Sequence, residues 1–149
     1  FNMERPGAGA AGGLGGALSA LGFRLCSGVD TVLEIVHARK RIEQAELVIV
    51  GEGMTDSQTA AGKAPCGIAR LAHELGRAAV CISGSLGNGY QELYSQGITA
   101  AFASVARPME LVTAMNHARE YLFDKARDVG RLWLAARNVK VEEKLDRKE

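Results

Sequence analysis

The sequence offers little that would suit a membrane or a nucleic acid as partner. Its 18 lysines and arginines stand against 17 acidic residues, and the formal net charge of +1 implies no broad electrostatic field. Uninterrupted apolar runs, such as residues 47–50, are far too short to cross a bilayer. We therefore expect no nucleic-acid or membrane partner, and any anion binding must be local.

Cysteine is also scarce. The three cysteines, Cys26, Cys66 and Cys81, are odd in number and form no C-x-x-C pair. This usage predicts reduced, mostly buried thiols in a cytoplasmic protein, not a disulfide framework or a zinc site. Residues 1–6 lack the apolar core of a secretory signal, and the chain does not begin with Met. We expect a piece of a longer protein, although N-terminal processing would leave the same start.

Short apolar runs alternate with amphipathic stretches, and glycines separate them. The chain has 149 residues, of which 47% are hydrophobic, and this is enough for one domain with a real core. Strands are expected at residues 45–50, 78–83 and, within an alanine-rich stretch, 98–105. Helical stretches lie between them, so the sequence predicts an α/β fold with a parallel sheet flanked by helices.

Several helix signals support this organisation. Leucines at positions 14, 18 and 21 share one helical face, and Ser27-x-x-Asp30 resembles a capping box. Pro65 and Pro108 suit the first turns of two further helices, the second of them long. Eight of the 12 residues in 138–149 are ionisable, which is typical of a frayed helix or a disordered tail. We therefore divide the chain into an α/β portion, residues 1–137, and a charged tail.

A first candidate site is the glycine segment that begins at Gly7 and reads G-x-G-x-x-G through Gly12. The dinucleotide-binding fingerprint of this form needs a buried strand directly before it, whereas here polar residues ending in Pro6 precede it. An NAD-dependent oxidoreductase is therefore a weak alternative. Free N–H groups at a helix start could still bind an anion or phosphate, or the small residues could simply allow close packing.

A second candidate is the polar loop over residues 51–65, which follows the first predicted strand. It holds two carboxylates, Glu52 and Asp56, together with an amide, three hydroxyl groups and Lys63. The segment is no Walker A loop, since no Ser or Thr follows the lysine and the glycine spacing differs. These residue types nevertheless suit phosphoryl transfer, in which carboxylates hold Mg²⁺ or accept a proton and a lysine offsets phosphate charge. The alternative is a surface loop with a capping Asp and a solvated Lys.

The third candidate, residues 83–89, follows the second predicted strand. It misses the G-x-S-x-G nucleophile elbow because position 83 is Ser, so a small-residue ligand loop and an ordinary turn both remain open. Ligands of open α/β sheets lie beyond the carboxyl ends of the strands, where both polar loops should meet. The three histidines, at positions 37, 73 and 117, are far apart and are expected to be ordinary helix residues.

Three stretches together resemble the type I glycerate kinases of bacteria. They are residues 6–15, residues 47–69 with their Gly-Glu-Gly, Asp-Ser-Gln-Thr and Gly-Lys-Ala-Pro-Cys-Gly segments, and residues 83–87. The resemblance implies ATP-dependent phosphorylation of glycerate, at the 2-hydroxyl, with Mg²⁺. It also implies two α/β domains around a cleft, of which this chain supplies the closing part of the larger one. The family's N-terminal motifs are absent, so the missing N-terminal part of the enzyme is an expected partner.

On the basis of this resemblance we expect the following roles. Asp56 and Glu52 position the substrate hydroxyl or Mg²⁺, and Lys63 offsets negative charge. The expected substrate- and phosphate-binding residues are Gly7, Gly9, Gly12, Gly53, Gln58, Thr59, Ser85 and Gly87. Met54 departs from the basic residue expected at its place. The main alternative is a noncatalytic module that binds a nucleotide or a small acid without turnover.

Overall fold

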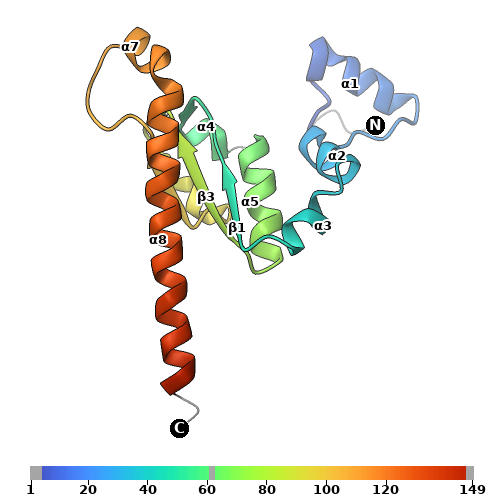
Figure 1. Ribbon diagram of the computed structural model, residues 1–149. Helices are drawn as coiled ribbons and strands as arrows, with labels where there is room; N and C mark the ends of the chain where they lie inside the picture. The colour runs from blue at the N-terminus through green and yellow to red at the C-terminus, as the bar shows by residue number, and fades with distance from the viewer. Residues whose placement is uncertain (1–4, 61–62, 147–149) are drawn as a thin grey trace.

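The computed structural model describes residues 5–60 and 63–146 (Figure 1). Three helices come first, followed by alternating strands and helices. The elements are α1 (Ala10–Ala20), α2 (Gly28–Ile35), α3 (Ala38–Glu43), β1 (Leu47–Val50), β2 (Met54–Thr55), α4 (Ser57–Ala60), α5 (Ala64–Glu74), β3 (Ala78–Ser83), β4 (Ser85–Leu86), α6 (Glu92–Ser95), β5 (Ala100–Ala103), α7 (Leu111–Asn116) and α8 (Ala118–Asp146).

The main sheet has three parallel strands in the order β1–β3–β5, as the sequence predicts for an α/β fold. The central strand β3 is the most buried, because it has a neighbour on each edge and helices on both faces. The apolar, β-branched residues 45–50 predict a buried strand, and β1 is buried only in part. It lies at the edge of this sheet, and Ile49 in it is 53% exposed.

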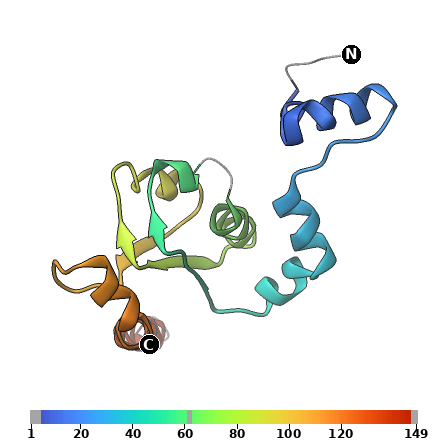
Figure 2. The ribbon, with the colours of Figure 1, turned by 90° about the horizontal axis from the view of Figure 1, so that it is seen from above.

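Two apolar layers hold the sheet between helices (Figure 2). On one face, α5 and α3 pack on Val48, Val50 and Cys81. On the other face, Val129 of α8 packs on Val80 and Ile82. The period-2 alternation of the strands thus sends successive side chains to opposite layers, which is how short strands come to hold two helices.

Two helix starts follow the sequence signals, but the prediction for Pro108 is wrong. The hydroxyl oxygen of Ser27 caps α2 by accepting a hydrogen bond from the N–H of Asp30 at 3.3 Å. Pro65 lies in the first turn of α5. The helix α7 begins only at Leu111, with Glu110 as its N-cap, so Pro108 lies before the helix and not in its first turn. The long helix expected from Pro108 is wrong as a single element, because the chain leaves the helix at His117 between α7 and α8.

The N-terminal helix α1 stands apart from the sheet, on the side of α2 and α3 (Figures 1 and 2). Its start is irregular, because Ala11, Gly12 and Gly13 have left-handed backbone angles inside the element. At Gly15 the chain passes so close to the carbonyl oxygen of Gly7 that a Cβ would collide with it. The glycine segment therefore makes a tight, strained turn at this helix start.

In the part of the chain that the structure describes, no helix is both long and apolar enough to cross a membrane.

Candidate functional site at the carboxyl edge of the sheet

The loops after β1 and β3 are joined by a small parallel sheet of two strands, β2 and β4. The N–H groups of Gly84, Ser85 and Gly87 donate to the carbonyl oxygens of Glu52, Gly53 and Thr55 at 3.1, 3.2 and 2.7 Å. A Cβ at position 84 would collide with the carbonyl oxygen of Gly53, so only glycine allows this approach. The two polar loops of the sequence thus form one structural unit.

Buried hydroxyl and thiol groups fix this unit to the sheet beneath it. Thr55 is fully buried, and its Oγ1 lies 2.5 Å from the Oγ of Ser83 and 3.7 Å from the Sγ of Cys81. The Sγ of Cys81 is in turn 3.3 Å from the Oγ of Ser83. Because buried polar groups are costly unless they are paired, this triangle favours one position of the β2 loop.

The two carboxylates of the first loop are held by the short helix α4. Asp56 precedes α4 and caps it, since its Oδ1 accepts from the N–H groups of Gln58 and Thr59 at 3.0 and 3.3 Å. The hydroxyl of Thr59 donates to Oε2 of Glu52 at 2.7 Å. The capping role foreseen as the alternative for Asp56 is therefore real. It uses one of the two carboxylate oxygens, and the side chain is only half-buried.

A cavity of about 500 Å³ opens at this edge of the sheet. Its walls come from the ends of β1 and β3, the residue after β5, and the first turns of α8. They are Ile49, Val50, Gly51, Glu52, Gly53, Ile82, Ser83, Gly84, Ser104, Ala118 and Leu122. Glu52 is the one ionisable side chain among them. The cavity thus combines apolar walls, backbone N–H and C=O groups and one carboxylate, a composition typical of small-molecule sites.

The structure brings together most of the predicted residues that follow β1 and β3. Glu52, Gly53, Asp56 and Thr59 surround the joined loops, and a Cβ at Gly87 would lie 3.3 Å from the Cβ of Asp56. Thr59 is fully buried, so its side chain contacts Glu52 and is not open to a ligand.

The other predicted residues lie around this centre or away from it. Gln58, Lys63 and Ser85 are exposed, and Lys63 directly precedes α5. Within the described residues Lys63 forms no ion pair. Gly7, Gly9 and Gly12 lie at the start of α1, apart from the sheet edge (Figures 1 and 2). The glycine segment of residues 7–12, a candidate phosphate-binding site in the sequence, therefore does not join the two polar loops in this chain.

Sequence reasoning missed some of the cavity walls. Ser104 follows β5 at the same edge as the two polar loops. It could have been predicted in the same way as those loops, because ligands of parallel sheets lie beyond the carboxyl ends of the strands. Ala118 and Leu122 carried no such signal, because their place depends on how α8 crosses the sheet.

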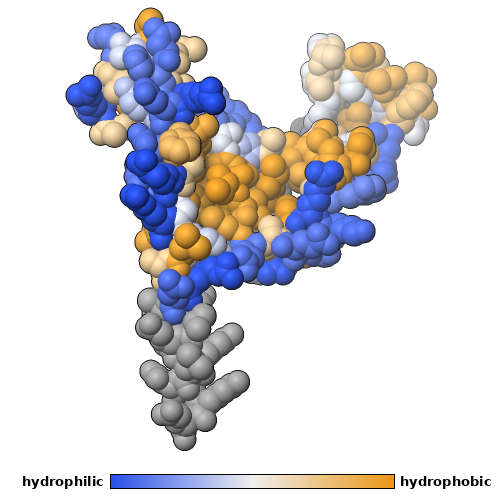
Figure 3. Space-filling model, viewed as in Figure 1, coloured by the Kyte–Doolittle hydropathy of each residue, from blue (hydrophilic) through white to orange (hydrophobic). Residues whose placement is uncertain are grey.

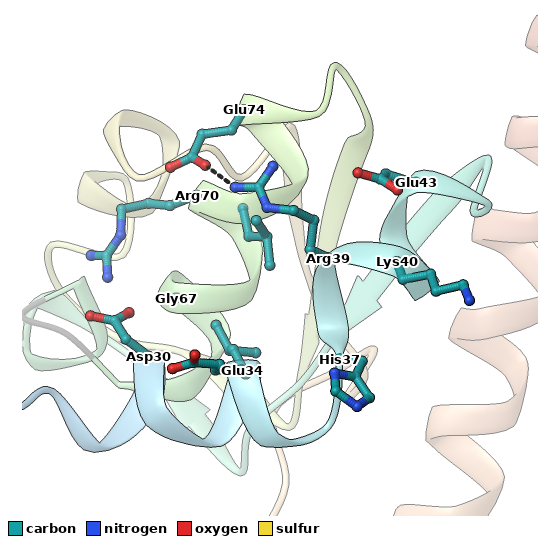
Figure 4. A pocket seen from close by; sticks show the side chains of 11 residues that line it. Asp30, Glu34, His37, Arg39, Lys40, Glu43, Gly67, Arg70 and Glu74 are labelled. Atoms are coloured by element: carbon teal, nitrogen blue, oxygen red, sulfur yellow. Dashed lines mark hydrogen bonds and ion pairs between the residues drawn. The ribbon is translucent and has the colours of Figure 1, made fainter.

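A larger cavity, of about 750 Å³, lies between α2, α3 and α5 (Figure 4). Its charged walls carry both signs, with four acids (Asp30, Glu34, Glu43 and Glu74) and three cations (Arg39, Lys40 and Arg70). Arg39 and Glu74 form an ion pair at 3.0 Å. The cavity contains none of the predicted site residues, and its mixed charges give it no preference for an anion or a cation.

A parallel sheet with joined polar loops and a cavity at its carboxyl edge is the arrangement in which proteins of the open α/β class bind their ligands. The profile of the glycerate kinase family matches residues 2–134, and the chain belongs to that family.

The relatives include proteins named as glycerate kinases. Glycerate kinase of Halalkalibacterium halodurans is 44% identical over 125 residues, which are 83% of this chain and 33% of the relative. Glycerate 2-kinase of Escherichia coli is 37% identical over 125 residues, with the same two shares of 83% and 33%. A crystal structure from Salmonella typhimurium, assigned as glycerate kinase 2, has a TM-score of 0.66 and 35% identity, and the match covers 89% of this chain and 34% of that one. The chain thus spans about a third of the length of these relatives.

Proposed function

We propose that this chain is the C-terminal part of an enzyme that transfers the γ-phosphate of ATP to glycerate. The observation that carries the proposal is the meeting of the loops after β1 and β3 around Glu52, beside the 500 Å³ cavity. Family membership and the names of the relatives support it. Because one relative is named glycerate 2-kinase, we further propose that the product is 2-phosphoglycerate.

Phosphoryl transfer asks a protein mainly for positioning and for electrostatic stabilisation. In our proposal, Asp56 and Glu52 orient the hydroxyl of glycerate and accept its proton, while Lys63 offsets negative charge. The N–H groups of Gly84, Ser85 and Gly87 are already bonded to the loop after β1, so these groups shape the site through their pairing and do not donate to a ligand. Gln58 and Ser85 are both exposed, and in our proposal their side chains bind substrate.

The residues of the site also fit a Mg²⁺ ion held jointly with phosphates. Among the described residues, no three His, Cys, Asp or Glu side chains form a metal-binding group. Mg²⁺ in kinases, however, commonly takes only one or two carboxylates and completes its shell with phosphate oxygens and water. Glu52 and Asp56 provide such a pair. The chemistry that the ion supplies when bound is neutralisation of phosphate charge.

The rest of the enzyme is the partner that this proposal requires. The chain spans about a third of its relatives, so we propose that residues 1–137 complete a two-domain kinase and that residues 138–149 add a charged tail. Gly7, Gly9 and Gly12, which lie apart from the cavity, would meet ligand only in that complete protein. We also propose a cytoplasmic location, which the three free cysteines support.

Substitution of Asp56 in the full-length enzyme tests the proposal. We expect D56A to lower kcat for ATP-dependent phosphorylation of glycerate by about 10²-fold or more, because both a charge and an orienting group are lost. The matched control is D128N, which removes a carboxylate from the exposed surface of α8 and should leave kcat unchanged. Turnover of D56A close to that of the wild type contradicts the assignment.

A noncatalytic binding role can be separated from this one in a single comparison. Calorimetry reports binding of ATP and glycerate, and a coupled assay reports release of ADP. Binding without ADP release from the full-length protein would favour the noncatalytic module and exclude the kinase.

A further inference from the structure

Thr59 forms hydrogen bonds with both carboxylates of the site, those of Glu52 and Asp56. Its side chain is fully buried, although Ser57 and Gln58 in the same turn of α4 are exposed. Its hydroxyl donates to Oε2 of Glu52 at 2.7 Å, and its backbone N–H donates to Oδ1 of Asp56 at 3.3 Å. One residue thus contacts both acids.

The hydrogen bonds of Thr59 match its chemistry. A threonine hydroxyl has one proton to donate and two lone pairs to accept with. The proton goes to Glu52, and a lone pair accepts the N–H of Asp56 at 3.4 Å. The exchange between Thr59 and Asp56 has the reciprocal form of a capping box, with Thr in place of the usual Glu or Gln. The hydroxyl cannot turn toward a ligand without breaking its bond to Glu52.

The main chain of Thr59 is also fixed. Its carbonyl oxygen accepts a hydrogen bond from the thiol of Cys66, which is fully buried in α5, at 3.1 Å. The bond from Thr59 to Glu52 therefore begins at a point held by the core. A charge-assisted hydrogen bond from a fixed donor restricts the carboxylate more than one from an exposed side chain would.

We propose that Thr59 is a positioning residue, which fixes the Glu52 carboxylate at the cavity and contacts no substrate. The proposal rests on the proposed function, in which Glu52 faces the reacting groups. It replaces a direct substrate contact for Thr59 by an indirect role, which its burial favours. Loss of the hydroxyl would leave Glu52 present but free to take other rotamers, so a step that needs precise orientation would slow.

The test compares T59V and T59S in the full-length enzyme. T59V keeps the size of the side chain and removes the hydroxyl, and T59S keeps the hydroxyl. We expect T59V to lower kcat about 10- to 100-fold, which is the typical cost of losing a hydrogen bond that orients a functional side chain. The KM for glycerate and for ATP should change less than about threefold. T59S should retain kcat within about threefold. T99V, which removes the hydroxyl that accepts the N–H of Ala79 elsewhere in the sheet, is the matched control and should retain kcat.

A double variant shows whether Thr59 acts through Glu52. In an E52Q background T59V should have little further effect on kcat, because the carboxylate that it positions is already gone. Wild-type kcat in T59V, equal losses in T59V and T59S, or an undiminished T59V effect in E52Q would each overturn the proposal. Unchanged kcat in E52Q itself would instead count against the proposed function. If T59V does not fold, T59C, with its weaker S–H donor, takes its place and must also lose at least about tenfold.

Discussion

Cys66 shows how the site loop and the core constrain each other at the scale of one residue. Its side chain is fully buried at the start of α5 and donates to the main chain of Thr59. Burial is the largest cause of the raised pKa of the Cys66 thiol. Arg70 opposes the rise, and Glu52 and Cys81 add to it. Cys26, in contrast, is exposed, so the expectation of mostly buried cysteines holds for two of the three.

The raised pKa of Cys66 predicts an alkaline loss of stability. Because the folded protein disfavours the thiolate, its stability is unaffected below the pKa of an unfolded thiol, about 8.5, and declines as the pH rises above it. Unfolding of the full-length enzyme in urea, measured between pH 7 and 10, should show this decline. In C66A the decline should be smaller. An identical pH dependence in the two proteins would mean that ionisation of Cys66 does not limit alkaline stability.

The raised pKa also predicts that Cys66 is inert, since thiolates are the reactive form. In the native full-length enzyme at pH 7.5, iodoacetamide followed by peptide mass mapping should leave Cys66 unmodified. The same treatment in denaturant should modify it and supplies the control. Equal modification with and without denaturant would show that the start of α5 around Cys66 opens readily.

At the scale of elements, the contact between β2 and β4 depends on the absence of a side chain at position 84. A Cβ there would collide with the carbonyl oxygen of Gly53, a backbone atom that cannot move without disturbing β2. We expect G84A in the full-length enzyme to cost about 1–3 kcal/mol of stability, as overpacking does, and to lower kcat as the loops separate.

Thermal unfolding and kinetics measure both effects. G53A, where a Cβ would meet nothing within 4 Å, is the control for stability. Equal Tm values for G84A and G53A would contradict the argument.

Most elements of this fold could be predicted from local signals. The strand of residues 78–83 was predicted with the bounds that it has, because β-branched and small apolar residues fill a central strand. The start of α2 followed from its cap, and the start of α5 from Pro65. The break at His117 was missed because spacing of apolar residues continues through it, yet Leu111 and Met115 of α7 are 72% and 69% exposed.

The candidate site could be predicted only in part. The rule that ligands lie beyond the carboxyl ends of parallel strands located both loops, since it needs only the order of strands and helices. It could not show that Thr59 is buried while Gln58 is exposed, because that depends on contacts with Glu52 and Cys66. It also could not show that the Gly7 segment lies away from the sheet, because that depends on the path of α1–α3.

At the scale of the whole molecule, the chain leaves much apolar surface in contact with solvent. Large side chains on α2, β1 and α8 are more than half exposed, among them Ile35 at 71%, Ile49 at 53% and Leu132 at 63%. Figure 3 shows apolar residues gathered in the hollow between α8 and the α2–α3 helices. Exposed apolar patches of this kind mark contact surfaces. In the full-length kinase proposed above, we expect the rest of the protein to pack on this surface, because the chain spans only a third of its relatives.

Substitutions on the helix α2 test whether the rest of the protein packs on this surface. None of its residues is buried here, and Ile35 points an apolar side chain into solvent. If the rest of the enzyme packs on this helix, I35K in the full-length protein should cost about 1–3 kcal/mol, because burial of a large apolar side chain is lost. E34Q, which changes the exposed neighbour on the same helix, should cost less than about 0.5 kcal/mol. Thermal unfolding compares the two.

Equal Tm values for I35K and the wild type would mean that this face of α2 stays in water in the complete enzyme. A lower Tm for I35K, with an unchanged Tm for E34Q, would mean that α2 is stabilised by contacts from outside this chain.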